Sequence, residues 1–220
     1  MKILCMADLH GAWDEESPLY ELNLLKYDWP EADVAVCAGD FTYLGDLTEV
    51  VRFNTFFRSL PYKHKILIAG NHCRSFYNNN AFTRQFVQDI TYLQDSGVEI
   101  DGVKFWGTPW SPTFMDWFFM DSEEGLTERY KKIPDDTDII ISHSPPYDIL
   151  DETKDHKKIG SKALLSRIKE IKPKFVIFGH NHEGYGKITK TIDGKLVTFL
   201  NCSSMDEEYN IVNQPVLIEI

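Results

Sequence analysis

Five apolar runs in this chain each end in a turn that carries aspartate, asparagine or histidine. The first run spans Lys2–Ala7 and the third spans Lys65–Ala69. Apolar runs of about four to eight residues between turn signals indicate strands that are buried on both faces. Open α/β sheets form their crevices at the carboxyl ends of such strands, so the five turns are expected to meet at one place. The turns are Asp8-Leu9-His10, Gly39-Asp40, Gly70-Asn71-His72, Ser142-His143 and Gly179-His180-Asn181-His182.

Helices are expected between the first of these strands. Apolar residues recur at roughly helical spacing over Leu47–Ser59, and Pro61 should end this helix because proline cannot continue one. Helices are also expected near Pro18–Tyr27 and over Phe82–Leu93, the latter closed by Gly97. Alternation of strands and helices implies right-handed crossovers and a parallel sheet.

The second half of the chain adds hairpin signals. Asp101-Gly102 and Asp193-Gly194 each lie between β-prone runs, which predicts two tight hairpins. The other expected elements are strand Ile139–Ser142, helix Ala163–Ile171, and strands Phe175–Phe178, Val197–Asn201 and Val216–Ile220. No repeat or linker divides the sequence. We therefore expect one domain over residues 1–220 with a mixed α/β fold, a four-layer αββα sandwich of two mixed β-sheets flanked by helices.

Charge and cysteine usage narrow the class of protein. With 34 acidic and 23 basic side chains the formal net charge is −11, which argues against holding nucleic acid by electrostatics. A small substrate attracted by a local, metal-centred field is expected instead. No apolar run is long enough to cross a bilayer and no signal-peptide pattern is present, so we expect a cytoplasmic protein without a membrane partner. The four cysteines lack CxxC spacing and are expected to be reduced, and self-association into a homo-oligomer is left open.

The order and spacing of the five turns resemble a known family. The set Asp8-x-His10, Gly39-Asp40, Gly70-Asn71-His72, His143 and Gly179-His180-x-His182 resembles the calcineurin-like metallophosphoesterase superfamily. Flanking stretches such as Gly107-Thr108-Pro109-Trp110 and His143-Ser144-Pro145-Pro146 are similar to one subfamily, the metallophosphoesterase-domain-containing phosphodiesterases. This resemblance implies a metal-dependent phosphodiesterase acting on small phosphoesters, with cyclic nucleotides as the leading substrate class.

The resemblance also implies a role for each residue in these turns. Asp8, His10 and His182 would hold one ion, Asn71, His143 and His180 a second, Asp40 would bridge the two, and Asn71 and His72 would bind the substrate. Independently of any family, mixed imidazole, carboxylate and amide ligands suit two divalent ions of Mn, Fe, Zn, Ni or Co, with manganese favoured here. Two such ions clamp a phosphate and lower the pKa of a bridging water, and the resulting hydroxide attacks phosphorus in line with the leaving oxygen.

His72 is the expected catalytic acid. In the resembling families this histidine protonates the leaving group, and the next residue is usually an acid that orients the imidazole. This chain has Cys73 at that position, and a thiol cannot anchor an imidazolium as a carboxylate does. Either another group orients His72, or His72 contributes less to the reaction rate than the roughly 10²–10⁴-fold that is typical of a general acid.

Three features lie outside the ligand set, and two of them have an alternative interpretation. His64 and His156 are interpreted as surface or packed histidines. The aromatic segment Phe105–Met120 is interpreted as core or subunit contact, with a wall for stacking a nucleobase as the alternative. The charged stretch Asp151–Lys158 is interpreted as a solvated loop, with a lid over the site as the alternative.

The predicted activity also has rivals. A phosphomonoesterase or a nuclease would use the same kind of metal centre. A different class of protein would keep the fold as a binding scaffold with weak catalysis, and Cys73 is the one feature that favours it. Because every ligand position and His72 are filled, the hydrolase is the preferred hypothesis.

Overall fold

The first sheet collects the strands of the amino-terminal half. In the computed structural model, which describes residues 1–20 and 29–220, this sheet has the strand order β13-β1-β2-β3-β4. Strands β1 to β4 are parallel, and β13 pairs antiparallel with β1. Their bounds are β1 (Lys2–Met6), β2 (Val34–Ala38), β3 (His64–Ile68), β4 (Thr91–Leu93) and β13 (Val216–Glu219).

The second sheet has the order β11-β12-β10-β9-β6-β5. Its four inner strands are parallel, and the edge strands β5 and β11 are antiparallel to their neighbours. The strands are β5 (Ser96–Ile100), β6 (Val103–Thr108), β9 (Ile139–Ser142), β10 (Phe175–Phe178), β11 (Gly186–Ile192) and β12 (Lys195–Asn201). Both predicted hairpins are confirmed, because Asp101-Gly102 and Asp193-Gly194 turn with positive φ at both residues between β5 and β6 and between β11 and β12.

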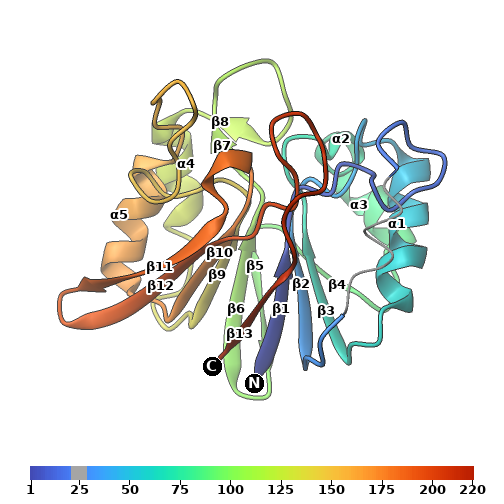
Figure 1. Cartoon of the computed structure of the whole chain (residues 1–220). Coiled ribbons are helices and arrows are strands. Elements are labelled where there is room, and N and C mark those ends of the chain that lie inside the picture. The colour runs from blue at the N-terminus through green and yellow to red at the C-terminus, as the bar shows by residue number, and fades with distance from the viewer. Residues whose placement is uncertain (21–28) are drawn as a thin grey trace.

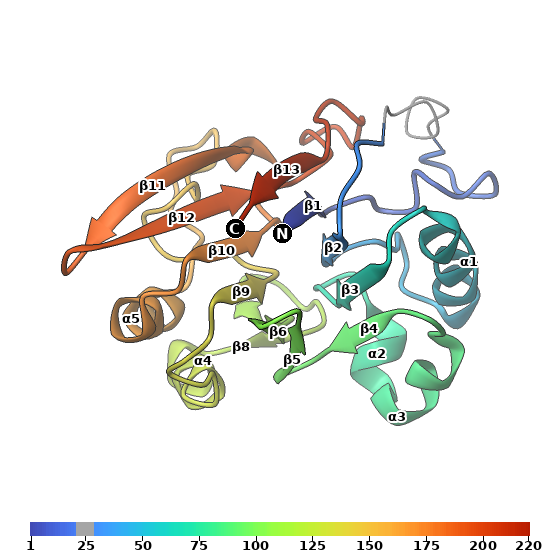
Figure 2. The same ribbon diagram turned by 90° about the horizontal axis from the view of Figure 1, so that it is seen from below.

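Helices cover the outer faces of the two sheets (Figure 1). Seen from below in Figure 2, α1, α2 and α3 lie outside the first sheet and α4 and α5 lie outside the second, so the predicted order of layers, αββα, is confirmed. The helices are α1 (Leu47–Ser59), α2 (Arg74–Asn78), α3 (Asn80–Thr83), α4 (Glu123–Tyr130) and α5 (Lys162–Ile171). Helix α1 has the predicted bounds: Asp46 and Glu49 form a capping box at its start, and Leu60, which precedes Pro61, caps its end.

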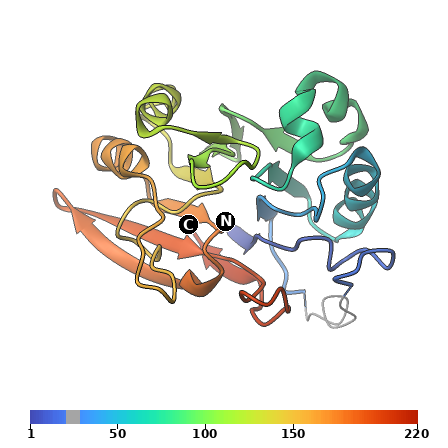
Figure 3. The ribbon, with the colours of Figure 1, turned by 90° about the horizontal axis from the view of Figure 1, so that it is seen from above.

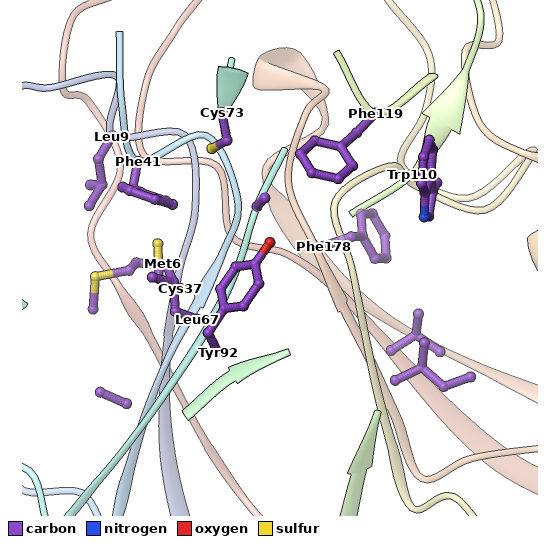
Figure 4. Close-up of a cluster of buried hydrophobic side chains, with 14 of the residues drawn as sticks. Met6, Leu9, Cys37, Phe41, Leu67, Cys73, Tyr92, Trp110, Phe119 and Phe178 are labelled. Atoms are coloured by element: carbon purple, nitrogen blue, oxygen red, sulfur yellow. The ribbon is translucent and has the colours of Figure 1, made fainter. Parts of the chain in front are cut away.

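Alternate residues of the strands pack into two different apolar layers. In β1, Ile3 and Cys5 belong to the cluster between the sheets, whereas Leu4 and Met6 belong to the cluster that includes the outer helices. Figure 4 shows Met6 in that second cluster, together with Phe41. Burial on both faces explains why these strands are apolar at every position.

The helix predicted over Phe82–Leu93 is wrong. The chain instead forms α3, a short 3₁₀ turn, η2 (Arg84–Phe86), and then strand β4. Asp89 adopts φ 57°, which no helix continues, and β4 then extends the first sheet beyond β3, where Tyr92 and Leu93 become buried. The helix expected near Pro18–Tyr27 falls mainly on residues 21–28, outside the described part of the chain.

The turns after five parallel strands meet at one edge of the molecule. These strands are β1, β2 and β3 of the first sheet and β9 and β10 of the second, and their carboxyl ends point away from the two chain termini (Figure 1). Figure 3 looks down on this edge, with long loops around it. Within residues 1–20 and 29–220, no helix combines the length and apolar character needed to span a bilayer.

Candidate metal centre

The turns at this edge have left-handed backbone conformations. Asp8, His10, Asp40 and His180 adopt φ of 53°, 38°, 46° and 66°, although none of them is glycine. Such conformations cost on the order of 1–3 kcal/mol each and persist only where the surrounding structure requires them. They lie just beyond β1, β2 and β10, so these four strained residues fall where the predicted ligands meet.

Asp8, His10 and His182 form the first half of the site. One potential ligand atom from each lies within 4.8 Å of the others, and the Nε2 atoms of the two histidines are 3.3 Å apart. Asp8 Oδ2 accepts hydrogen bonds from the Ser203 hydroxyl at 2.6 Å and from the His180 amide at 2.8 Å. Asp8 Oδ1 is buried and has no partner among the described residues. Burial raises the pKa of this carboxyl, so a neighbouring cation would stabilise it as an anion.

Asp40, His143 and His180 form the second half, again with ligand atoms within 4.8 Å of one another. His143 Nε2 lies 3.2 Å from Asp40 Oδ2 and 2.9 Å from Asn71 Oδ1. Burial and the neighbouring His143 lower the pKa of His180 to about 3, which keeps its imidazole neutral, the form that binds metals.

Asp40 lies between the two halves. Besides its contacts with His143 and His180, its carboxylate forms a third group of potential ligands with His10 and His72. Its Oδ1 accepts a hydrogen bond from the backbone amide of His72 at 2.8 Å. Burial alone would raise the pKa of Asp40, but the surrounding histidines, His143 foremost, hold it well below its usual range.

The protonation pattern around His143 fits a cation. Its Nδ1 lies 3.1 Å from the carbonyl oxygen of Ala38, which can only accept, so Nδ1 carries the proton. In the neutral ring, Nε2 then directs a lone pair at two oxygens, from Asp40 and Asn71. Burial would lower the pKa of His143, yet the Asp40 carboxylate raises it to about 9. The Asp40 carboxylate thus favours positive charge at this point, and a divalent ion bound by these donors would supply it in place of a proton on Nε2.

His72 has a replacement for the missing acidic neighbour. Its Nδ1 lies 2.9 Å from the backbone carbonyl oxygen of Tyr43, which orients the ring and leaves Nε2 for the substrate. One face of the imidazole packs on Trp117 at a centroid distance of 4.2 Å. Cys73 does not serve as the orienting group, because its thiol is fully buried in the apolar cluster (Figure 4). The polar neighbour of this thiol is the Thr42 hydroxyl, at 3.6 Å.

Two glycines allow the ligands to approach each other. A Cβ on Gly70 would collide with Asp40 Oδ1 and would lie 2.7 Å from the ring of His143. A Cβ on Gly39 would collide with His143 Nδ1, and Gly39 also adopts φ 98°. The glycines that precede Asp40 and Asn71 are therefore needed because no side chain fits there.

A cavity of about 770 Å³ opens beside these ligands. Phe114, Met115 and Trp117 line one part of it, and the lysines at 157 and 158 line another. Phe114 and Trp117 remain 54% and 41% exposed, although both lie against histidines of the site, Phe114 against the ligand His180 and Trp117 against the expected acid His72. Apolar rings left open beside a polar centre are suited to covering a flat part of a substrate.

The aromatic segment Phe105–Met120 thus serves both interpretations. Phe105, Trp110 and Phe119 are buried and belong to the two apolar clusters, as the core interpretation predicts. Of the residues between Trp110 and Phe119, the cavity is lined by Pro112, Thr113, Phe114, Met115 and Trp117, whereas Ser111 stays buried and Phe118 packs against the core.

The charged stretch Asp151–Lys158 is exposed over most of its length but is anchored beside the site. Asp151 is fully buried and its carboxylate accepts from the backbone of the same loop. The Asn181 side chain, between two ligand histidines, donates to the carbonyl oxygens of Leu150 and Glu152 at 3.0 and 3.2 Å. This loop borders the cavity through residues 153 and 157–160, as the lid interpretation requires.

The structure brings together every residue of the predicted site, and the two histidines outside it lie elsewhere. His156 is exposed and pairs with a carboxylate of its own loop. His64 is the first residue of β3, at the end of this strand that lies away from the site. Three residues beside the site were not predicted from the sequence, because they lie after the last motif: Ser203, Asp206 and Tyr209. The Asp206 backbone carbonyl accepts a hydrogen bond from the ring of His182 at 2.8 Å, a contact that no residue type signals in advance.

Comparison with known proteins agrees with this geometry. The sequence model of the calcineurin-like phosphoesterase family matches residues 1–184. The chain is 34% identical to metallophosphoesterase domain-containing protein 1 of Homo sapiens over 245 aligned residues, covering all of this chain and 71% of that protein. It is 32% identical to a UPF0046 protein of Caenorhabditis elegans, covering all of this chain and 75% of the relative.

Similar solved structures share the fold at low sequence identity. One, 17% identical, superposes with a TM-score of 0.63 and covers 99% of this chain and 98% of its own. Another is GAP50, the anchor in the inner membrane complex of Plasmodium, with 14% identity, a TM-score of 0.55 and coverage of 97% of this chain and 75% of its own.

Proposed function

The chain belongs to the calcineurin-like phosphoesterase family, and we propose that it is a binuclear phosphodiesterase of small phosphoesters, with cyclic nucleotides as the leading substrate class. As a member of this family it is a metal-dependent phosphoric ester hydrolase. The position of Asp40 supports the binuclear centre, because its carboxylate belongs both to the group with His143 and His180 and to the group with His10 and His72. A carboxylate shared in this way is placed to bridge two ions.

The proposed ligands follow the two halves of the site. Asp8, His10 and His182 would hold one ion, Asn71, His143 and His180 the other, and Asp40 both. When bound, such ions activate water and neutralise charge on the phosphoryl oxygens. Mixed nitrogen and oxygen donors suit Mn, Fe, Zn, Ni or Co, and we propose manganese as the favoured metal.

His72 is proposed as the residue that binds the phosphate and protonates the leaving oxygen, with Asn71 beside it as a second substrate contact. With Nδ1–H donating to the Tyr43 carbonyl, the other ring nitrogen is left for the cavity that His72 lines, and it donates there when the ring is the imidazolium, the form that a general acid must take. Trp117 restricts rotation of the imidazole from one face. A proton held at a fixed position is what a general acid requires.

The cavity supports a small substrate. Its volume of about 770 Å³ is in the range of sites for single small molecules. Phe114 and Trp117 offer ring faces on which a nucleobase could stack. Because the net charge is −11, long DNA or RNA should bind only weakly. The proposed location is the cytoplasm, and no membrane partner is proposed.

The test combines metal analysis with hydrolysis of two model esters. The wild-type protein should bind two ions per chain and hydrolyse bis-p-nitrophenyl phosphate faster than p-nitrophenyl phosphate. Asp40→Asn should lose bound metal and reduce kcat/KM by about 10²-fold or more, because second-shell changes alone cost about 10–100-fold in such sites. The matched control His64→Gln, at the far end of β3, should retain both properties.

Two results would contradict the proposal. A single ion per chain in the active protein would exclude the binuclear centre. Preference for the monoester, or rapid cleavage of long nucleic acid, would replace the phosphodiesterase with one of its rivals. A protein that binds metal but hydrolyses none of these esters would instead support the scaffold.

A further inference from the structure

The segment that follows β12 closes one side of the metal centre. It comprises residues 203–213, beyond the part of the chain that the family's sequence model matches. Ser203 donates to Asp8, and the Asp206 carbonyl accepts from His182. The ring of Tyr209 lies 4.9 Å from the ring of His10 and 5.6 Å from that of His182, edge-on to both. This segment therefore reaches all three residues of the first half of the site.

Tyr209 is held in this position by the backbone around it. The Asp206 carboxylate accepts hydrogen bonds from the amides of Glu208 and Asn210 at 3.0 and 2.9 Å, and Met205 pairs with Ile211 across the turn. Tyr209 itself adopts φ 62°, a conformation that costs a residue with a Cβ roughly 1–2 kcal/mol. The turn is thus built to keep one ring at one place, despite the backbone strain.

The hydroxyl of Tyr209 has no hydrogen-bond partner within residues 1–20 and 29–220. Three tyrosines, by contrast, donate theirs to carbonyl oxygens: Tyr62 to Pro30, Tyr130 to Trp110 and Tyr185 to Gln214. Tyr209 is half-buried and lines the same cavity as the histidines His10, His72 and His182. A phenol that lines the cavity without such a partner can donate a hydrogen bond to a molecule bound there.

We propose that the Tyr209 hydroxyl donates a hydrogen bond to a non-bridging phosphoryl oxygen of the bound substrate, which makes Tyr209 a substrate-binding residue. This inference rests on the proposed phosphoesterase site and adds a contact to it. The phosphoryl group is the expected partner because the ring lies against His10 and His182, whereas the apolar wall of Phe114 and Trp117 lies against His180 and His72. The leaving group would cover that wall, and the phosphoryl oxygens would face Tyr209.

The experiment uses Tyr209→Phe, which removes only the oxygen and keeps the ring packed on the two histidines. Tyr77→Phe is the matched control, because Tyr77 is also half-exposed but does not line the cavity. Both variants and the wild type are loaded with manganese. The measurements are metal content, affinity for inorganic phosphate by calorimetry, and kcat/KM on one diester with a p-nitrophenolate leaving group and one with an alkoxide leaving group.

Tyr209→Phe should keep the wild-type metal content and bind phosphate about 10-fold more weakly, because hydrogen bonds to charged groups are among the stronger ones. Its kcat/KM should fall about 10- to 100-fold, by the same factor for both diesters, since the phosphoryl oxygens are common to them. Tyr77→Phe should match the wild type.

Several outcomes would overturn the inference. Unchanged phosphate affinity would show that the hydroxyl does not contact the phosphoryl group. Loss of metal would show that Tyr209 supports the ligands instead, and a larger loss on the alkoxide ester would make it a proton donor. If the wild type binds phosphate but hydrolyses no ester, the proposed function fails and the phosphate affinities still decide the role of Tyr209. Failure of the loaded wild type to bind phosphate would refute both.

Discussion

Replacing Cys73 by aspartate restores the acidic neighbour of His72 that is usual in the resembling families, yet the structure predicts that it destabilises this protein. The thiol is fully buried among apolar side chains, with the Thr42 hydroxyl as a neighbour. Burial, and secondarily the Asp40 carboxylate, raise its pKa from 9.0 to about 12. Because one pKa unit corresponds to about 1.4 kcal/mol, placing an anion there costs about 4 kcal/mol. His72 gains nothing in exchange, since the Tyr43 carbonyl already orients it.

The cost should depend on pH in a defined direction. The pKa of the introduced carboxyl is raised in the folded state relative to its value of about 3.9 in the unfolded chain. The deficit in the free energy of unfolding is therefore small below about pH 4, grows as the pH rises toward the folded-state pKa, and is complete at about pH 8. Cys73→Ser adds no charge, so its smaller deficit should not change over this range.

Urea denaturation of the metal-free protein measures this effect without a bound cation to offset the carboxylate. At about pH 8 Cys73→Asp should be roughly 4 kcal/mol less stable than the wild type, and near pH 4 the two should differ by little more than Cys73→Ser does. Equal stability of the aspartate and serine variants at pH 8 would refute the reasoning, and so would an aspartate variant with raised activity and unchanged stability.

Two further predictions concern the site itself. His72→Ala should reduce kcat/KM by about 10²–10⁴-fold on esters with an alkoxide leaving group and by much less on p-nitrophenyl esters, because p-nitrophenolate departs without a proton; equal losses on both would remove His72 from the acid role. Gly70→Ala should leave the protein folded but lower its metal content and cost on the order of 10²-fold in activity, because the added methyl collides with Asp40 and presses on His143; metal analysis beside circular dichroism checks this, and wild-type metal content would contradict it.

Several features of this protein are local and could be read from the sequence. Strands such as β9 and β10 are apolar at every position because both faces are buried, and a run of that kind between turn residues is visible without a structure. The same holds for the Asp-Gly hairpins, whose positive φ angles need those residue types, and for α1, which carries its own capping residues. The predicted ligands were recognised because they recur at the same point after each strand.

Other features were decided only by tertiary contact. The segment predicted as a helix over Phe82–Leu93 became strand β4 because the edge of β3 offered hydrogen bonds and a buried surface for Tyr92 and Leu93, and this outweighed local helical spacing. Competition of this kind depends on a partner more than twenty residues away, which no local pattern specifies.

The groups that surround the predicted ligands were also decided only by tertiary contact. The groups that orient His72, His143 and His182 are backbone carbonyls, of Tyr43, Ala38 and Asp206, and every residue has such a carbonyl whatever its side chain. Tyr209 approaches His10 across about 200 positions of sequence, brought there by the pairing of strands rather than by any motif. The sequence alone determined which side chains can bind metal, since that depends on residue type. The fold determined how each is oriented and what faces it, because these depend on where distant backbone lies.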